Sequence, residues 1–395
     1  MTTSIVGVHK RSLLPLYIPS LLMGIPAQAS LVLLPLYVLE LGSGPALAAM
    51  VVGFRGLGMM TAGIPAGLFV ARVGEKRLMI LASISLAVVF FSYAILESIV
   101  WFALMAFVHG CASSAFLLAR LTYLSGNISG SERGRVIAVI GTSMRASALI
   151  GPALAGFIAV KFSFAVAFFS GGFLFLFGSF LILIYMRKNA SQSKMVSIKS
   201  LCVLVREKCN VLATVGIVAV SFMFLRSARN LLLPLCGAGL GLGPEIVGTL
   251  VSFSAGVDML FAYPAGILMD RYGRRATAIP SSLLFCLTFV LISIANSSTG
   301  MLLAACMAGL ANGLSTGIVM ILGTDHAPAD ARGEFLGLWR LLTDVGTTTS
   351  PILISTMLTF ATLSFVSVFV ALIGLGGTLI VHRSVSETQN ITETR

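Results

Sequence analysis

The chain has 395 residues, of which 57% are hydrophobic and only 10% are charged, and its mean hydropathy is +1.01. This composition excludes an ordinary soluble globular protein. The formal net charge of +12 does not indicate nucleic-acid binding, because the basic residues form short clusters between long apolar runs, as in polytopic membrane proteins.

Polar breaks divide the chain into twelve apolar runs, each close to the ~20 residues that a membrane-spanning helix needs. The runs cover residues 13–39, 46–70, 78–96, 100–124, 136–160, 165–186, 210–236, 245–269, 276–295, 300–323, 335–359 and 364–382. Nearly all Lys and Arg residues outside them lie in the tails and in alternate connections, whereas the intervening connections hold only Lys161. Because cytoplasmic loops are rich in Lys and Arg, we expect a multi-pass protein of the cell inner (plasma) membrane with both termini in the cytoplasm.

A single spacing of 199 residues relates the two halves. Pro65, in PAGLFVARVGEKR, corresponds to Pro264, in PAGILMDRYGRR. The same spacing links Leu34-Pro35-Leu36 to Leu233-Pro234-Leu235, Gly44-Pro45 to Gly243-Pro244, Arg133-Gly134 to Arg332-Gly333, and Pro152 to Pro351. A constant register indicates two copies of one unit. We therefore predict an N-terminal six-helix bundle (1–186), a cytoplasmic linker (187–209) and a C-terminal six-helix bundle (210–395).

The connection after the second run of the second half has the pattern G-x-x-x-D-R-x-G-R-R. Its members are Gly266, Asp270, Arg271, Gly273, Arg274 and Arg275, and the first half keeps Gly67, Arg72 and Gly74, with Ala71 in place of the acid. This element, the two six-helix copies and the basic central loop together resemble the major facilitator superfamily of transporters. The resemblance implies an all-α polytopic membrane protein with twelve transmembrane helices in two six-helix bundles. We expect the loop to be a conformational latch; the alternative, a positive-inside anchor, explains the arginines but not Asp270 or the glycines.

The fifth run contains a second, partial resemblance. Its pattern Ser147-x-x-x-Gly151-Pro152-x-x-Ala155-Gly156 is similar to the small-residue motif of the superfamily's drug antiporters, with two glycines replaced by Ser147 and Ala155. The alternative is generic small-residue helix packing with a proline kink.

Eight charged residues interrupt the apolar runs. They are Arg55, Arg120, Arg145, Arg226, Arg229, Arg340, Asp258 and Asp344. Charges inside a membrane usually face a bundle interior or a water-filled cavity, so these residues are site candidates. Arg120, Arg226 and Arg229 fall toward the ends of their runs, where we expect them to snorkel to the interface.

Arg145 and Asp344 occupy equivalent positions in the fifth run of each half, ~18 Å from the basic ends at 1.5 Å per residue. Substrate sites of such transporters lie near the bilayer midplane. We predict that these two side chains face each other across a central cavity and that Arg145 binds the negative group of the substrate. Arg55 and Arg340 are further candidates for substrate binding, and Asp258, Asp344 and His109 for proton coupling. The alternatives are a static Arg340–Asp344 pair and a packing role for His109.

The surplus of arginines within the runs favours anionic or polar substrates. The leading hypothesis is proton-coupled efflux of a small organic solute, a drug or an anionic metabolite, by alternating access in a monomer. The alternatives are an uptake permease for organic anions and, outside transport, a membrane enzyme or a receptor scaffold. The sequence has no HExxH motif, and we expect no enzyme. The six cysteines are scattered and are interpreted as packing residues, with no metal or cofactor.

Overall fold

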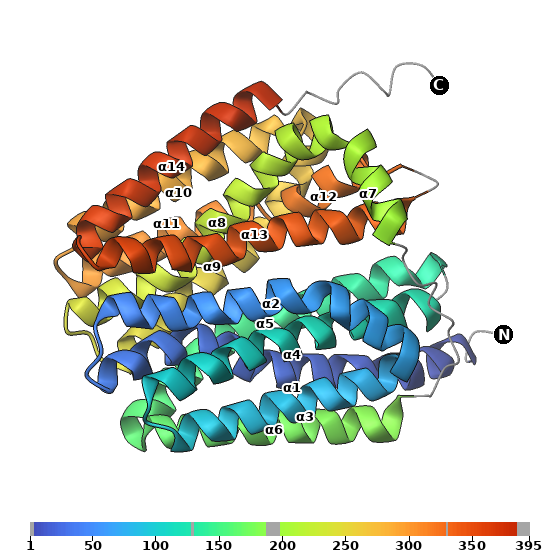
Figure 1. The fold of residues 1–395 in the computed structure, drawn as a ribbon, viewed down its shortest axis with the longest axis horizontal. Helices are drawn as coiled ribbons and strands as arrows, with labels where there is room; N and C mark the ends of the chain where they lie inside the picture. Colours follow the sequence, from blue (N-terminus) through green and yellow to red (C-terminus); the bar gives the residue numbers. More distant parts are fainter. Residues whose placement is uncertain (1–3, 128–129, 187–197, 329–330, 385–395) are drawn as a thin grey trace.

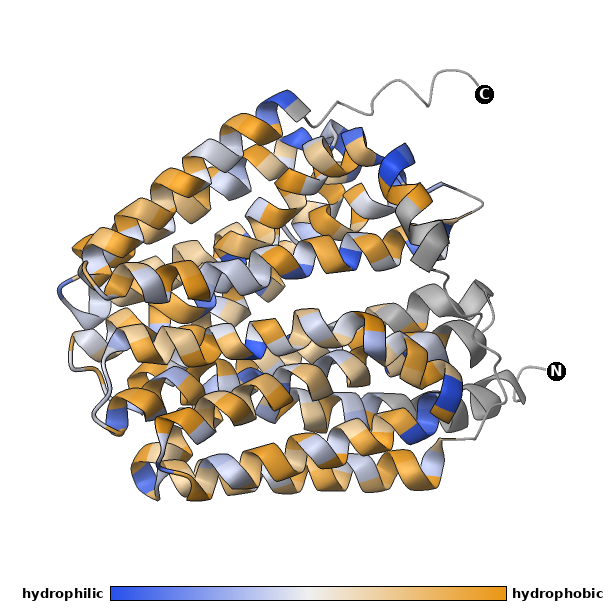
Figure 2. Cartoon of the chain, in the orientation of Figure 1, coloured by the Kyte–Doolittle hydropathy of each residue, from blue (hydrophilic) through white to orange (hydrophobic). Residues whose placement is uncertain are grey.

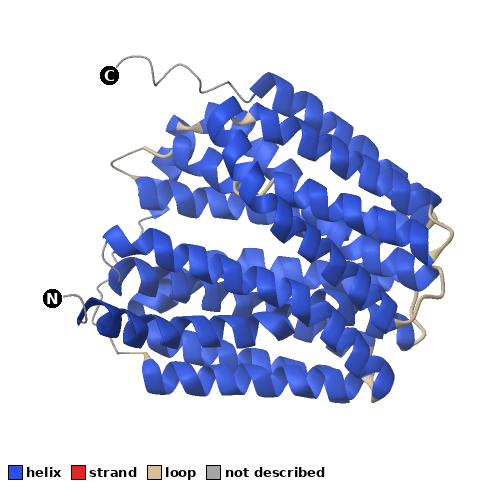
Figure 3. Cartoon of the chain, turned by 180° about the vertical axis from the view of Figure 1, so that it is seen from behind, coloured by secondary structure: helices blue, strands red, loops and turns tan. Residues whose placement is uncertain are grey.

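The computed structural model describes residues 4–127, 130–186, 198–328 and 331–384, and these ranges are α-helical apart from short turns (Figure 1). The first half contains α1 (Ser4–Glu40), α2 (Pro45–Val73), α3 (Glu75–Ile95), α4 (Ile99–Asn127), α5 (Gly130–Lys161) and α6 (Phe164–Tyr185). The second half contains α8 (Cys209–Gly239), α9 (Pro244–Tyr272), α10 (Arg275–Ile294), α11 (Ser298–Leu314), α12 (Ile318–Asp325), α13 (Arg332–Leu358) and α14 (Leu363–Ser384). No strand occurs in the ranges just given (Figure 3).

Two features differ from the predicted pattern of runs. The segment expected to be a linker contains the helix α7 (Ile198–Glu207), and residues 187–197 of that segment lie outside the described ranges. The predicted run 300–323 is divided into α11 and α12, because the chain turns at Ser315–Gly317 and Gly317 adopts a φ of +87°. A positive φ of this kind is accessible to glycine at little cost.

Within the described part of the chain, eleven stretches of helix are long and apolar enough to cross a membrane, with Ser298–Asp325 counted as one. The twelfth predicted span is α13, which has 27 residues but includes Arg340, Asp344 and the polar stretch 347–350. α13 packs against α2 of the other bundle and α8 of its own. Its counterpart α5 packs in the same way against α9 of the other bundle and α1 of its own. Figure 2 shows apolar residues along the length of the helices and strongly hydrophilic residues mainly toward their ends. The predicted all-helical fold in two bundles is confirmed.

The two halves repeat each other in packing and in backbone detail. In the first, α1 packs on α5 and α6, α2 on α4, and α3 on α4 and α6; in the second, α8 packs on α13 and α14, α9 on α11, and α10 on α11 and α14. The turns after α1 and α8 use Gly42 and Gly241, with φ of 78° and 76°, and the turns after α2 and α9 use Gly74 and Gly273, with φ of 86° and 83°. Each pair is related by the 199-residue spacing found in the sequence.

One side of the molecule is rich in basic residues. The turns after α2 and α9 carry Arg72, Lys76, Arg271, Arg274 and Arg275, and the first residues of α1 and the last residues of α14 lie on the same side (Figure 1). We call this the basic side. The other side, with the turns before α2, α4, α9 and α11, is called the opposite side.

The most extensive contacts between the bundles follow two seams, α5 with α9 and α2 with α13, and α1 also contacts α8. At the first seam, an ideal Cβ on Gly156 would lie 2.2 Å from the carbonyl oxygen of Pro244, and one on Gly248 would lie 2.3 Å from that of Pro152. At the second, the Ser355 hydroxyl donates to the carbonyl of Ala46 (2.7 Å). These residues lie in the half of each helix nearer the opposite side, and the bundles diverge toward the basic side (Figures 1 and 3). The molecule is therefore closed on the opposite side.

Candidate substrate site

An ion pair joins the two bundles near the middle of the helices. Nη1 of Arg145, on α5, lies 3.5 Å from Oδ1 of Asp258, on α9, and the two side chains are 28% and 16% exposed. Asp258 lies 14 residues along α9, or ~21 Å from the opposite side at 1.5 Å per residue. This depth is where transporters built from two repeats hold their substrates.

Asp258 is held by its own bundle more closely than by Arg145. Nδ2 of Asn312 donates to Oδ2 of Asp258 (2.8 Å), and Oγ1 of Thr316 donates to Oδ1 (3.3 Å). Both donors are on the last turn of α11 or just after it. They reach the carboxylate because α9 and α11 are in close contact: a Cβ on Gly309 would lie 2.3 Å from the carbonyl oxygen of Ser254. The carboxylate is thus fixed in place whether or not Arg145 is bound.

Arg226, on α8, binds the same part of α11. Its Nη2 donates to the carbonyl of Ser315 (2.6 Å) and to the Ser315 hydroxyl (2.8 Å). The carbonyls at the end of a helix lack helical partners and carry partial negative charge. A cation at this point therefore stabilises the break between α11 and α12, and it binds the residue next to Thr316, which donates to Asp258.

Arg229 is a third arginine of this region, three residues after Arg226 on α8. It is 8% exposed and donates to the carbonyl of Ala308 (3.3 Å) and to Oδ1 of Asn230 (3.2 Å). We call Arg145, Arg226, Arg229 and Asp258 the central cluster. Its positive charges outnumber its negative charge, so it can attract a further anion.

The expectation that Arg226, Arg229 and Arg120 snorkel to the interface is not met. α8 extends from Cys209 to Gly239, which puts Arg226 and Arg229 well inside the helix rather than at its end. Arg120 is 6% exposed; its Nη2 donates to Sδ of Met144 (3.6 Å) and its guanidinium lies 5.8 Å from the centre of the Phe116 ring. The sequence placed the run boundaries too close to these residues.

Asp344 does not pair with Arg145. Its Oδ1 accepts from Nε of Arg340, one turn earlier on α13, at 3.0 Å, as in the static pair that the sequence left as an alternative. The Asp344 side chain is 8% exposed and that of Arg340 is 46% exposed. The acid that faces Arg145 across the seam is Asp258 instead. The repeat predicted the depth of this pair but not the helix that supplies its acid.

Two other candidates, Arg55 and His109, lie within the N-terminal bundle. The carbonyl of Arg55, on α2, touches α4, because a Cβ on Gly110 would lie 2.0 Å from its oxygen. His109, on α4, is fully buried, and its Nδ1 lies 3.4 Å from the hydroxyl of Tyr93. The structure does not bring either residue into contact with the central cluster.

The loop with the pattern G-x-x-x-D-R-x-G-R-R, on the basic side, forms its ion pair through Arg274 and not through Asp270. Asp270 and Arg271 are exposed and have no ion pair within the described ranges. Instead, Nε of Arg274 lies 3.3 Å from Oδ2 of Asp325, at the end of α12. Gly74 and Gly273 supply the positive φ of the two turns, whereas Gly67 and Gly266 are inside helices.

A clamp, repeated in both halves, follows each of these turns. Nζ of Lys76 donates to the carbonyl of Leu183 (2.7 Å) and that of Met186 (2.6 Å), at the end of α6. Nη2 of Arg275 donates to the carbonyl of His382, at the end of α14. Lys76 corresponds to Arg275, and Leu183 to His382, at the spacing of 199 residues.

The small-residue motif of α5 packs this helix against two neighbours. On one face, the Ser147 hydroxyl donates to the carbonyl of Leu21 (3.1 Å), and a Cβ on Gly151 would lie 2.5 Å from the carbonyl oxygen of Ile25. On the other face, Pro152 and Gly156 touch α9. The motif therefore joins α1 to α5 and forms the closed seam with α9.

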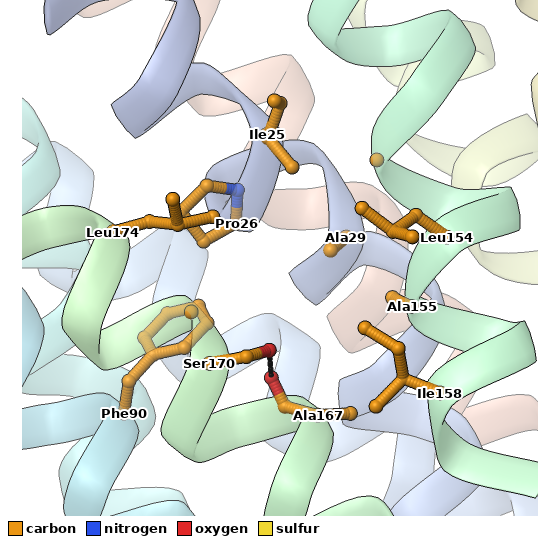
Figure 4. Close-up of a pocket in the computed structure, with 12 residues that line it drawn as sticks. Ile25, Pro26, Ala29, Phe90, Leu154, Ala155, Ile158, Ala167, Ser170 and Leu174 are labelled. Carbon is orange, nitrogen blue, oxygen red and sulfur yellow. Dashed lines mark hydrogen bonds between the residues drawn. The ribbon is translucent and has the colours of Figure 1, made fainter. Parts of the chain in front are cut away.

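A small pocket lies behind this motif, between α1, α5 and α6. Its volume is about 20 Å³, and Figure 4 shows the apolar side chains that line it, with Pro26 and Leu154 facing the space. Its one hydroxyl, that of Ser170, donates to the carbonyl of Ala167 (2.8 Å). A space this small has room for a single water molecule, so it is a packing gap rather than a substrate site.

The residues that sequence reasoning missed are Asn312, Ser315, Thr316 and Asp325. The first three are polar residues in an apolar run, and their spacing places them on one turn of a helix. Asp325 precedes a polar connection and looked like an ordinary loop residue. Only the fold shows that they are partners of Asp258, Arg226 and Arg274.

The fold consists of two related bundles of helices with a charged group of residues between them. The sequence profile of the Major Facilitator Superfamily matches residues 16–202 and 215–394. The chain belongs to this superfamily, and it is a multi-pass membrane transporter rather than an enzyme.

Relatives and solved structures agree with this assignment. The chain is 23% identical over 296 residues to the multi-drug resistance efflux pump PmrA of Streptococcus pneumoniae, covering 71% of this chain and 72% of that protein. It is 35% identical to YwtG of Bacillus subtilis over only 107 residues, 27% of this chain and 23% of that protein. The crystal structure of the nucleoside transporter NupG superposes with a TM-score of 0.75 at 14% identity, covering 94% of this chain and 98% of that chain. This last likeness shows the fold alone.

Proposed function

We propose that this chain transports a small organic anion together with a proton, with the central cluster as the shared site. The observation that carries the proposal is the pair of Arg145 and Asp258, which links the two bundles at mid-depth. In this pair the carboxylate of Asp258 binds Arg145, which is the cation that a carboxylate of the solute would otherwise bind. Asp258 is therefore an internal competitor of an anionic substrate.

The sign of the coupling follows from this competition. A proton on Asp258 removes its negative charge and releases Arg145, while Asn312 and Thr316 still hold the side chain in place. The solute's acidic group then binds Arg145, with Arg226 and Arg229 adding positive charge behind it. Proton and anion each favour binding of the other, which is the requirement for carrying both in one direction.

We place the basic side in the cytoplasm, since Lys and Arg are concentrated there. The chain is then a monomer of the cell inner membrane, with an N-terminal bundle (1–186), a cytoplasmic linker (187–209) and a C-terminal bundle (210–395), seen here closed to the outside. The Arg274–Asp325 pair connects the loop element to α12, so this loop serves as the conformational latch on the cytoplasmic side. Asp270 and Arg271 remain candidates for latch contacts in the conformation with the opposite seam open.

The experiment uses the purified protein in liposomes with a panel of radiolabelled monocarboxylates. The wild type is expected to accumulate one or more of them when the external pH is lowered. Asp258→Asn mimics the protonated acid and leaves Arg145 free. It should bind the solute about 10- to 150-fold more tightly, given ~1.5–3 kcal/mol for a hydrogen bond to a charged group, and it should exchange solute without responding to the pH gradient. Normal proton-driven accumulation by Asp258→Asn would refute the coupling role.

Efflux of a drug in exchange for protons is the second candidate, and two observations favour it. The pump PmrA is related over most of both chains, and the small-residue motif of α5 forms the closed seam. In exchange, proton and solute compete, so lowering the external pH would expel a loaded solute. Ethidium loaded into the same liposomes provides this test: proton-driven loss of ethidium, with no monocarboxylate accumulation, would favour the efflux pump.

A further inference from the structure

A groove with a volume of about 490 Å³ runs beside the closed seam, near the opposite side of the molecule. α9 forms its floor, because this helix packs between α5 and α11. Its lining includes Phe157 of α5, Glu245, Ile246 and Thr249 of α9, and Thr299 and Leu302 of α11. Sites that bind small molecules have volumes of ~300–1,000 Å³, so this groove is large enough to hold a ligand.

The groove faces the bilayer and not the space between the bundles. On one flank of α9, Ser252 accepts a hydrogen bond from the backbone N–H of Ala153 on α5 (2.9 Å). On the other flank, the carbonyl of Ser254 touches Gly309 of α11. The helical period places Asp258 on nearly the opposite face from the groove. The face between the two flanks is exposed along its length and carries Ile246, Thr249, Phe253 and Leu260.

Glu245 is a charged residue of the groove, and its carboxylate has no partner among the described residues. A Cβ added to Gly243 would lie 2.6 Å from Oε1 and 2.5 Å from Oε2, so the carboxylate lies over the turn before α9. Oε2 is closed to solvent, whereas Oε1 is accessible. Lys161 does not neutralise it: Nζ of Lys161 lies 5.5 Å from the centre of the Phe157 ring. A carboxylate without a cation attracts a positive group.

The first turn of α11 supplies a place for a negative group. The Ser297 hydroxyl accepts from the backbone N–H of Gly300 (3.2 Å), which leaves the N–H groups of Ser298 and Thr299 without helical partners. Both residues line the groove, and both are exposed. Free N–H groups at the start of a helix bind phosphate groups. One groove therefore offers an acceptor for a cation, donors for a phosphate, and an apolar floor.

We propose that this groove binds a phospholipid whose headgroup carries a primary ammonium, of the phosphatidylethanolamine type. The ammonium donates to Oε1 of Glu245, and the phosphate accepts from the first turn of α11. An acyl chain lies along the exposed face of α9, past Phe253. A free cation or a free anion would match only one end of the groove, whereas this headgroup carries both charges. The lipid site is separate from the central cluster and does not rest on the transport proposed above.

The lipid should bind best while the seam is closed. Phe157 follows Gly156, where an added Cβ would lie 3.2 Å from Cα of Glu245. When α5 and α9 separate, the wall that contains Phe157 moves away from Glu245 and the groove is lost. A ligand that binds one conformation better shifts the population toward it. The lipid is therefore expected to favour the conformation that is closed on the opposite side.

The test measures the binding of single lipids to the purified, delipidated full chain by native mass spectrometry. With equal acyl chains, phosphatidylethanolamine should bind more tightly than phosphatidylcholine, whose ammonium has no N–H, and than phosphatidylglycerol, which has no ammonium. Glu245→Gln should weaken phosphatidylethanolamine binding about 10- to 100-fold, as for one hydrogen bond to a charged group, and should remove the preference. Glu97→Gln, which neutralises an exposed acid on the same side of the other bundle, is the matched control and should bind as the wild type does.

Ile246→Trp fills the groove without changing its charge and should weaken the binding of phosphatidylethanolamine. The proposal is overturned if the three lipids bind alike, if Glu245→Gln keeps the preference, or if Ile246→Trp binds as the wild type does. Binding of ethylammonium that depends on Glu245, with no preference among the lipids, would also overturn it in favour of a free cation. Gly156→Ala should bind the lipid more weakly than Gly141→Ala; equal affinities would overturn the preference for the closed seam.

Discussion

The closed seam between α5 and α9 should not tolerate a methyl group at Gly156. In Gly156→Ala the new Cβ would lie 2.2 Å from the carbonyl oxygen of Pro244, against 3.4 Å for an ordinary contact, so the helices must separate by about 1.2 Å. Overpacking of this kind costs ~1–3 kcal/mol. The cost applies only while the seam is closed, because the contact is between two bundles that separate in the other conformation.

The population of molecules open on the opposite side should therefore rise about 5- to 150-fold for ~1–3 kcal/mol. The assay is double electron–electron resonance between spin labels at residues 97 and 296, which are exposed on the opposite side of the two bundles. Gly156→Ala should populate a longer distance, while Gly141→Ala, on the same helix but with no atom within 4 Å of the added Cβ, should not. An unchanged distance in Gly156→Ala would refute this account of the seam.

Three other substitutions test features of the second bundle. Gly317→Ala should lower the stability by ~1–2 kcal/mol, because the residue has a φ of +87°, although a Cβ would find room. Gly376→Ala is the control and should leave the stability unchanged, because its added Cβ would meet no atom. Equal melting temperatures of the two variants would argue against a strained turn at Gly317. Arg274→Gln and Asp325→Asn should slow transport to the same extent, and the double variant no further; additive losses would show that the two residues act separately. Asp344→Asn should lower the Tm by several degrees with unchanged solute affinity, since it breaks an ion pair within one helix; weakened binding at an unchanged Tm would place Asp344 in the substrate site.

The architecture could be predicted from the sequence because it depends on features that recur along the chain. Apolar runs near 20 residues predict spanning helices, and the 199-residue spacing predicts two equivalent bundles. The same spacing predicts that Gly42 and Gly241 share a backbone conformation, and their φ values differ by only two degrees. Polarity within a span was harder to interpret: α13 is a spanning helix by position although its composition alone does not show it.

The partners of the charged residues could not be predicted in the same way. The repeat related Arg145 to Asp344 in sequence, but side chains pair with whatever the neighbouring bundle places opposite them. The neighbour of α5 is α9, and α9 supplies Asp258. The break after α11 was also hidden, because Gly317 lies among residues apolar enough to continue a helix, and only the contact of Arg226 with Ser315 shows what stabilises it.

The clamps made by Lys76 and Arg275 also bear on how the protein is made. Each clamp joins a residue to a carbonyl 107 positions further along the chain. A ribosome that synthesises the protein from its N-terminus has therefore added both partners of the first clamp to the chain before it begins α8. The N-terminal bundle can close its outer helices while the second bundle does not yet exist. The contacts that hold the outer helices of each six-helix unit therefore lie within that unit and do not require the seams between the bundles.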